Sequence, residues 1–200
     1  SGASGTIARS TPAALDAWES RSTSDERTKD DHIVSIFRTT TRSSYGLVTS
    51  AGRLVLAHVV ELPALAASPQ TNVAGGIPAD ELIGMTESTD PIPGEHVVAA
   101  IPMDQRDDDG PTPAAPLAIG TRAGVVKRWN REAPTTMDSW SVIDLKDGDS
   151  VLFAADAADE DRLVFIASDS SLLTFDAGNV RPQGRTAGGM AGIRLAEGCT

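Results

Sequence analysis

A short strand, a glycine turn and a second short strand recur along this chain, and the pattern limits the folds open to it. The clearest copy runs from Leu117 to Trp129 and reads LAIGTRAGVVKRW. An apolar run over 117–121 meets a tight turn at Gly124, and a second, β-branched run leads into Lys127 and Arg128. Glycine suits the turn because it has no Cβ and adopts a positive φ at little cost. The segment therefore predicts a β-hairpin.

Three further copies of the hairpin pattern are predicted near residues 1–15, 46–60 and 163–176. Gly52 follows Gly5 by 47 residues, and Gly124 follows Gly52 by 72. In the last copy Ser171 takes the glycine position, again 47 residues after Gly124. Two equal periods and one longer period indicate a repeat array with one insertion. We assign the insertion to the acidic, proline-rich loop at 104–116.

Shorter apolar runs supply the other strands of each repeat. Strands are predicted at 33–37, 81–85, 97–103, 142–145 and 151–155, and a loop is predicted over 16–31. A unit of roughly 47 residues with about four short strands has the size of a propeller blade. We therefore predict a single all-β domain over residues 1–200, a propeller-like array of about four blades. The strand that should precede Gly5 is missing, which suggests that the array is cut from a longer protein.

Composition sets the outer bounds on function. No apolar run approaches the ~18 residues of a membrane span, and no basic-then-apolar leader opens the chain. The single cysteine, Cys199, excludes a disulfide within the chain and fits a reducing, cytoplasmic compartment. The net charge is −11. A polyanion such as DNA would therefore need a segregated basic face.

The basic residues are segregated along the sequence. Residues 120–132 hold four cations against one anion, Glu132, and residues 179–195 hold three arginines and no acid. Acids gather instead in the stretches at 104–109 and 146–162. Positive charge thus follows the hairpins and negative charge follows the connecting loops.

Three segments carry a resemblance to a known family: 120–129, 145–151 and 179–195. They resemble the C-terminal domain of the A subunit of bacterial type IIA DNA topoisomerases, most closely the actinobacterial topoisomerase IV form. The resemblance implies a β-pinwheel whose basic rim binds and bends double-stranded DNA, without sequence specificity, and guides the segment to be passed. It also implies a nucleoid-associated parent enzyme that hydrolyses ATP, with an N-terminal part carrying the cleavage tyrosine and a separate ATPase subunit. No cofactor and no catalytic residue are expected in this domain.

One departure separates the two branches of that family. Gyrase A subunits carry a basic, glycine-rich box in the first-blade loop, and the corresponding loop at 19–27 has no such box. The resemblance therefore favours topoisomerase IV over gyrase and implies weak DNA wrapping at best.

The candidate DNA-binding residues are the cations of the hairpins and of the C-terminal segment. They are Arg9, Arg53, Arg122, Lys127, Arg128, Arg131, Arg181, Arg185 and Arg194. A second hypothesis is an acidic protein-interaction propeller in which the loops at 104–109 and 156–161 recruit a basic partner. A metal site is not expected, because His32, His58 and His96 are far apart in the sequence and Cys199 lies near none of them.

Overall fold

Three of the four predicted hairpins form, at 46–60, 117–129 and 163–176. The structure is a computed structural model that describes residues 5–19, 33–65, 75–85, 92–103, 106–107, 110–111 and 114–200. Its strands are β1 (Thr6–Ile7), β2 (Ser44–Thr49), β3 (Arg53–His58), β4 (Ile77–Pro78), β5 (Val97–Pro102), β6 (Arg106–Asp107), β7 (Gly110–Pro111), β8 (Leu117–Thr121), β9 (Val125–Trp129), β10 (Ser139–Ser141), β11 (Val151–Asp156), β12 (Arg162–Ile166), β13 (Leu172–Asp176), β14 (Pro182–Gln183) and β15 (Met190–Ala191). The helices are α1 (Pro12–Glu19) and α2 (Ala79–Met85), with 3-10 turns η1 (Val59–Glu61) and η3 (Ala177–Asn179).

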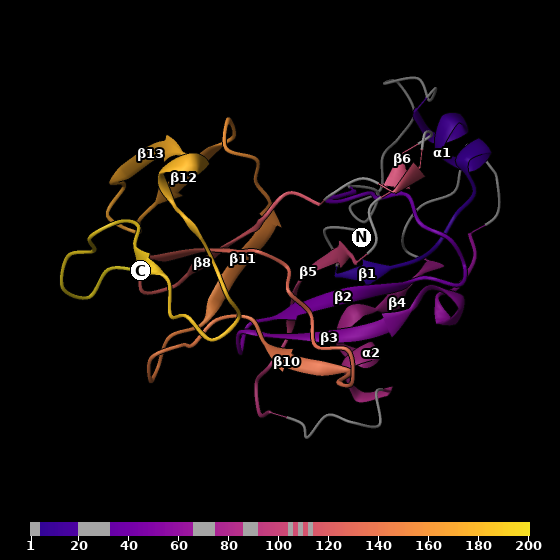
Figure 1. The fold of residues 1–200 in the computed structure, drawn as a ribbon, viewed down its shortest axis with the longest axis horizontal. Helices are drawn as coiled ribbons and strands as arrows, with labels where there is room; N and C mark the ends of the chain where they lie inside the picture. The colour runs from indigo at the N-terminus through magenta and orange to yellow at the C-terminus, as the bar shows by residue number, and fades with distance from the viewer. Residues whose placement is uncertain are drawn as a thin grey trace.

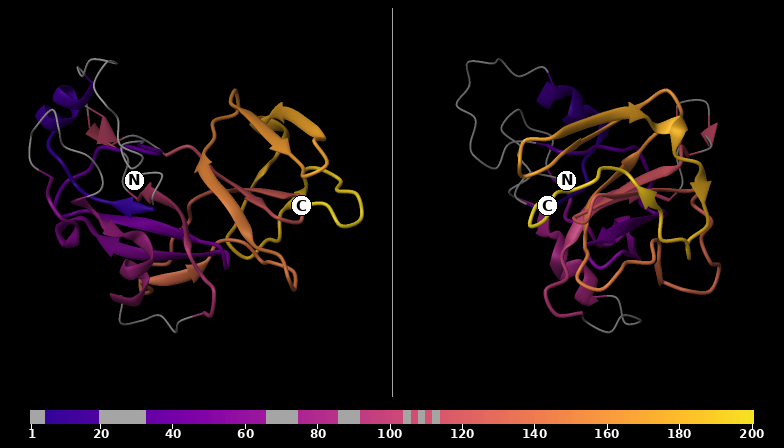
Figure 2. Two further views of the ribbon diagram at one scale, coloured as in Figure 1. Left: turned by 180° about the vertical axis from the view of Figure 1, so that it is seen from behind. Right: turned by 90° about the vertical axis from the view of Figure 1, so that its left-hand side faces the viewer.

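The strands form a row of small sheets, which we call blades 1 to 4 in chain order (Figure 1). Blade 1 is β1 with β4, and blade 2 has the strand order β10-β3-β2-β5. Blade 3 has the order β11-β8-β9, with β14 and β15 both on the outer edge of β9. Blade 4 is the hairpin β12-β13. Figure 2 shows blades 3 and 4 side by side, with blades 1 and 2 at the opposite end of the molecule.

Blades 1, 2 and 3 each receive a strand from the repeat that follows them. β4 comes after the β2–β3 hairpin but pairs with β1, and β10 comes after the β8–β9 hairpin but pairs with β3. In the same way β15 comes after the β12–β13 hairpin and pairs with β9. All three pairings are antiparallel. Neighbouring blades are therefore linked by exchanged strands as well as by packing.

Three apolar clusters fill the spaces between successive blades. The first, around Tyr45, Leu47 and Leu82, joins blade 1 and α2 to blade 2. The second, around Leu54, Ile119 and Trp129, joins blades 2 and 3. The third joins blades 3 and 4 and includes the buried side chains of Val126, Leu163 and Phe165. The inner strands β2 and β8 are buried along almost their whole length, because both of their faces are covered.

The opposite face of blade 4 is apolar and exposed. Val164, Ile166 and Leu172 are exposed by 51%, 72% and 62%. In blade 3 the residues at the same hairpin positions, Ala118 and Val126, are fully buried. This outward face thus has the character of an interblade face.

Each of the three hairpin turns contains a residue with positive φ, and in the last hairpin that residue is one position earlier than predicted. Gly52 and Gly124 have φ values of 76° and 77°, as the sequence pattern predicts. In the last hairpin the equivalent residue is Ser170, with φ 69°, and not Ser171. Its N–H donates to Ala167 O at 2.9 Å, as Gly124 N–H donates to Thr121 O at 3.0 Å. The last period is therefore 46 residues, since the turn geometry and not the residue type sets the register.

A second turn repeats three times and anchors each hairpin tip. It contains Gly94, Gly148 and Gly198, all with positive φ. The residue two positions after each glycine accepts a hydrogen bond from a hairpin-tip N–H. The bonds run from Ser50 to His96 (2.9 Å), from Arg122 to Ser150 (2.8 Å) and from Ser168 to Thr200 (2.8 Å). The turn at 146–149 is therefore one of a set of three.

Several predicted elements are wrong. Residues 81–85 lie in α2 and not in a strand, because Asp80 and Glu81 in the first turn suit a helix start and Leu82 and Ile83 pack together on the first cluster. The predicted hairpin at 1–15 is β1 followed by α1, which extends into the loop expected at 16–31. The strand expected at 142–145 is absent, and β10 lies three residues earlier. The strand expected at 33–37 does not form either, since 34–40 has no regular structure. Of the expected loop 104–116, only β6, β7 and 114–116 lie within the described residues.

The closeness of the blades gives a first prediction. A Cβ at Gly124 would lie 2.5 Å from Ile193 O, at a positive φ that already disfavours side chains. At Gly148 φ is also positive, but a Cβ would meet nothing within 4 Å. We expect Gly148→Ala to lower the free energy of unfolding by about 1–2 kcal/mol, from the backbone conformation alone. Gly124→Ala should cost at least twice as much, measured by urea denaturation, and equal losses would contradict the close blade packing.

Candidate nucleic-acid interface

The structure divides the nine predicted DNA-binding cations into internal and exposed groups. Five are tied to the protein by their side chains: Arg9, Arg53, Lys127, Arg128 and Arg131. The other four, Arg122, Arg181, Arg185 and Arg194, have exposed side chains. The sequence pattern gives both groups the same appearance, so burial alone separates them.

Lys127 is fully buried in β9. Its Nζ donates to three backbone carbonyls, Val142 O at 2.7 Å, Arg185 O at 2.9 Å and Ala187 O at 2.7 Å. An ammonium has three N–H donors, so these bonds use all of them. Burial lowers the pKa of Lys127 to about 8, and the nearby Asp144 carboxylate acts in the opposite direction. The prediction that Lys127 lies on a DNA-binding rim is wrong, because its ammonium is buried and binds backbone carbonyls of the protein.

Arg128 is buried on the opposite face of β9, with 1% exposure. Its guanidinium donates to Ala177 O at 3.0 Å, Val180 O at 3.1 Å and Ala157 O at 2.9 Å. It also pairs with the exposed carboxylate of Asp159 at 2.7 Å. Arg128 therefore ties blade 3 to the segments that flank blade 4, and the expectation of a rim position is corrected here too.

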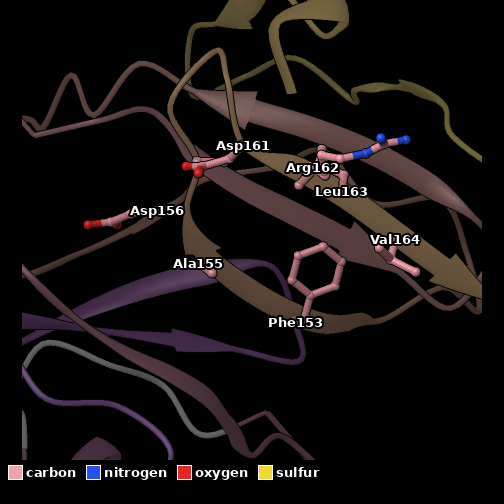
Figure 3. A pocket seen from close by; sticks show the side chains of 8 residues that line it. Phe153, Ala155, Asp156, Asp161, Arg162, Leu163 and Val164 are labelled. Carbon is pink, nitrogen blue, oxygen red and sulfur yellow. The ribbon is translucent and has the colours of Figure 1, made fainter. Parts of the chain in front are cut away.

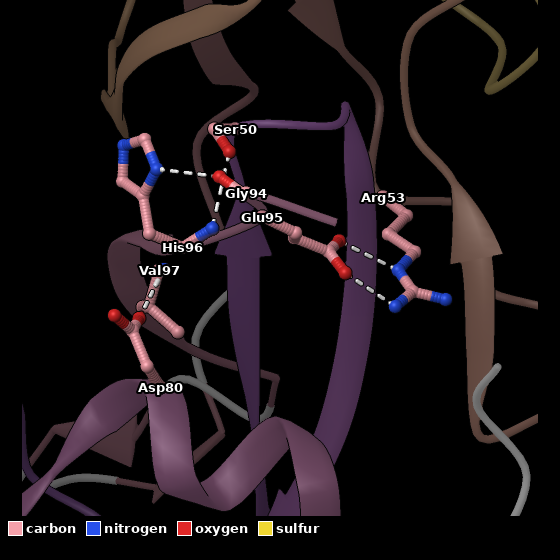
Figure 4. Close-up of polar contacts among 7 residues, drawn as sticks. All are labelled: Ser50, Arg53, Asp80, Gly94, Glu95, His96 and Val97. Atoms are coloured by element: carbon pink, nitrogen blue, oxygen red, sulfur yellow. Dashed lines mark hydrogen bonds and ion pairs between the residues drawn. The ribbon is translucent and has the colours of Figure 1, made fainter. Parts of the chain in front are cut away.

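Two further predicted cations form ion pairs with carboxylates. Arg53 pairs through Nε with Glu95 Oε1 at 2.7 Å, and a second guanidinium nitrogen binds Glu95 Oε2 (Figure 4). Its side chain is only 15% exposed. Arg131, with φ 61°, donates to Ala115 O at 2.7 Å and also pairs with Asp156. Desolvation lowers the pKa of Arg131, and its Asp156 partner opposes that effect.

Arg9 joins blade 1 to the end of η1. Its Nε donates to Leu62 O at 2.8 Å, and its backbone forms a parallel bridge with Ala64. The side chain is half-buried. Its primary contact is therefore structural.

Three of the four exposed arginines lie on one segment, residues 179–195, which we call the arginine arch. The arch closes the outer edge of β9: β14 runs parallel to it at Arg128 and Trp129, and β15 runs antiparallel to it at Val125 and Val126. Between β14 and β15 the chain turns through an Ala187 N–H bond to Gly184 O of 3.3 Å. The arch carries no acidic residue. It is thus a short basic ridge on the edge of blade 3.

The fourth exposed arginine, Arg122, lies near the end of this arch. Gly124 O, in the turn that holds Arg122, accepts hydrogen bonds from the N–H groups of Gly192 and Ile193 at 2.9 and 3.1 Å. Arg194 is the next residue. The structure therefore brings Arg122 and Arg194 to the same end of blade 3, although they are 72 residues apart in sequence.

A hollow lies between β11 and β12 (Figure 3), and we call it the acidic hollow because two carboxylates line it against one cation, Arg162. Its volume is about 380 Å³, and Phe153 and Leu163 supply its apolar wall. Asp156 and Asp161, from the predicted acidic loop at 156–161, also line it. Asp156 is paired with Arg131, and Asp161 accepts a bond from Ala158 N–H at 2.8 Å.

Among the described residues, no group of three or more His, Cys, Asp and Glu side chains could hold a metal ion. In that same part of the chain no helix is long and apolar enough to cross a membrane. The loop at 19–27, used above to separate topoisomerase IV from gyrase, lies almost entirely outside the described residues.

Solved structures share this fold, although no family model matches the sequence and no curated protein matches it. A C-terminal domain of DNA topoisomerase IV aligns with 98% of this chain and 56% of its own, at a TM-score of 0.64 and 22% identity. The chain has the β-pinwheel fold of that domain. The E. coli ParC C-terminal domain aligns over 94% of this chain and 68% of its own length, at a TM-score of 0.57 and 15% sequence identity. A DNA gyrase A C-terminal domain aligns over 80% of this chain and 46% of its own length, at a TM-score of 0.51 and 19% sequence identity.

This β-pinwheel uses two of its basic residues in a way that sequence reasoning missed. Lys127 and Arg128 lie between apolar residues of a strand that is covered on both faces. A charged pair inside such a strand is a signal for buried anchoring, since its side chains must point to opposite faces. This signal is present in the sequence pattern, but the charge segregation and the family resemblance both favoured a solvated rim.

The lowered pKa of Lys127 gives a pH prediction for the stability of the pinwheel. Between about pH 8 and the ordinary lysine value near 10.5, the unfolded chain binds a proton that the folded chain has lost, so the free energy of unfolding contributed by Lys127 rises with pH. We expect a gain of about 1 kcal/mol from pH 8 to pH 9. The measurement is the difference in urea-denaturation free energy between the wild type and Lys127→Met at each pH. A difference that is constant with pH would show that Lys127 keeps an ordinary pKa.

Proposed function

We propose that this chain is a DNA-binding, non-catalytic domain of the A subunit of a type IIA topoisomerase, of the topoisomerase IV kind. It would hold a curved DNA segment by its phosphates and help present that segment for passage. The chain spans 56% of the topoisomerase IV domain that it matches. ATP-dependent strand passage would belong to the complete enzyme, through the N-terminal part of the same subunit and its ATPase subunit partner, in the nucleoid of the cytoplasm.

The arginine arch is the observation that carries this proposal. Arg181, Arg185 and Arg194 are exposed on a segment without acids, and Arg122 lies at the same end of blade 3 as Arg194. Guanidinium groups bind phosphate oxygens with paired N–H donors. Because no recognition helix is present among the described residues, the contacts fit the DNA backbone and not the bases.

The net charge of −11 limits the affinity of this interface. Acids on the surface, among them the exposed Asp144 beside the turn of the arch, repel DNA, and beyond about 8 Å that repulsion is screened at physiological ionic strength. Contacts at the arch are shorter than this distance, so local charge decides whether DNA binds. We therefore expect weak binding to duplex DNA that falls steeply with added salt.

Neutralising the arch tests the proposal. The variant with Arg181, Arg185 and Arg194 all changed to Gln should lose most of its affinity for long duplex DNA at ~50 mM salt. The slope of log K against log salt should fall by about 2–3, because each lost phosphate contact removes about 0.9 from it. Fluorescence anisotropy with labelled DNA provides both values.

Arg162→Gln is the matched control, because Arg162 is exposed by 64% in blade 4 and lies outside the arch. It should leave affinity and salt slope unchanged. Absence of binding by the wild type even at low salt would rule out DNA contact by this chain.

A protein-interaction role is the second candidate, and the acidic hollow favours it. Its apolar wall and its carboxylates, Asp156 and Asp161, suit an extended partner segment that alternates apolar and basic residues. Such a partner should shift the NMR signals of Leu163 and Val164 and should bind the arch variant normally. Binding that requires the arch arginines would exclude this candidate site.

A further inference from the structure

The hairpin position that Lys127 occupies does not by itself require a cation. Matching the three hairpins at Gly52, Gly124 and Ser170 places Lys127 level with Val55 in blade 2 and Leu173 in blade 4. Val55 is fully buried in the first apolar cluster. An aliphatic side chain therefore satisfies the same hairpin position in the neighbouring blade. The ammonium in blade 3 must serve something particular to that blade.

What is particular to blade 3 is the backbone held by that ammonium. Two of its three acceptors, Arg185 O and Ala187 O, belong to the arginine arch. The third, Val142 O, belongs to the segment after β10 in blade 2. Ala187 O also accepts from Asp144 N–H at 3.2 Å, so the arch and the blade 2 segment meet at one point. Lys127 thus binds the backbone of the arch turn from inside the protein, while the side chain of Arg185 is exposed to solvent.

The rest of the arch cannot hold this turn alone. β14 and β15 are two residues each, and both pair with β9. Between them, residues 184–189 have a single internal backbone bond, from Ala187 N–H to Gly184 O, at a long 3.3 Å. Gly184, Gly188 and Gly189 give this stretch little conformational restriction of its own. The two charge-assisted bonds from Lys127 to Arg185 O and Ala187 O therefore dominate the geometry of this turn.

We propose that Lys127 is the positioning residue of the DNA-binding surface: it never touches DNA, but its buried ammonium sets the shape of the arch that presents Arg181 and Arg185 to phosphate. This inference rests on the proposed function for its DNA part. Its structural part, the fixing of the arch by Lys127, stands without DNA. Two separate measurements can therefore separate the failure of one from the failure of the other.

The test compares Lys127→Met with Val55→Ala, the matched variant at the equivalent position of blade 2. Val55→Ala leaves a cavity in the first cluster and lowers stability without touching the arch. Within the stretch 184–189, hydrogen exchange in the DNA-free protein should become at least tenfold faster in Lys127→Met at the hydrogen-bonded amide of Ala187, and likewise at Asp144, whose N–H donates to Ala187 O. In Val55→Ala the exchange of this stretch relative to β8 and β9 should be unchanged. No local acceleration in Lys127→Met would overturn the proposal whether or not the protein binds DNA.

DNA binding gives the second readout. We expect Lys127→Met to bind duplex DNA about tenfold more weakly at low salt and to lose about 1–2 from the salt slope, although no surface charge is removed. Val55→Ala can only reduce the folded fraction, which weakens apparent affinity and leaves the slope as it is. An unchanged slope in Lys127→Met, or an equal change in both variants, would overturn the positioning role. If the wild type binds no DNA, the proposed function fails and the exchange result still decides the role of Lys127 in the arch.

Discussion

The arrangement of blades 2, 3 and 4 depends on two cations that leave β9 in opposite directions. Lys127 binds carbonyls of the segment after β10 and of the arginine arch, and Arg128 binds carbonyls on either side of blade 4. Buried charges are costly unless their hydrogen bonds are complete. Here six backbone carbonyls and one carboxylate surround the two groups, and only Arg128 Nε has no partner in the described structure. The strand β9 thus links blade 3 to the chain segments that flank blades 2 and 4.

Internal charge of this kind changes how the acidic composition should be understood. Lys127, Arg128, Arg131 and Arg53 are removed from the surface, whereas most carboxylates of the described residues, Glu95 excepted, remain exposed. The surface is therefore more acidic than the formal charge of −11 indicates. A DNA-binding role then rests on a few arginines gathered along one edge, held by cations that are themselves hidden.

Much of the fold could be predicted from the sequence, because local rules determine the hairpins. Glycine at positive φ and apolar runs on both sides define the turns at Gly52 and Gly124, and the resemblance in 179–195 gave the β-pinwheel. The helix α2 was missed because the run 81–85 is only five residues long. A run of this length with two adjacent apolar residues fits either a strand or a turn of helix. β10 was displaced because its sequence, Ser-Trp-Ser, has no strand pattern and is held by the edge of β3. The site was half predicted: the arch stands out by composition, but whether a cation faces water or three carbonyls depends on contacts between distant residues.

The exchange of strands between repeats has a consequence for how this domain comes apart. In a stack of independent repeats, one unit can melt while its neighbours persist. In blades 1 to 3 the closing strand of the sheet comes after the next hairpin in the chain, as β10 does for blade 2 and β15 for blade 3. Loss of one hairpin therefore removes the edge strand of the sheet before it. The blades are links of one cooperative unit, and a cut between two hairpins would separate the sheet before the cut from its closing strand.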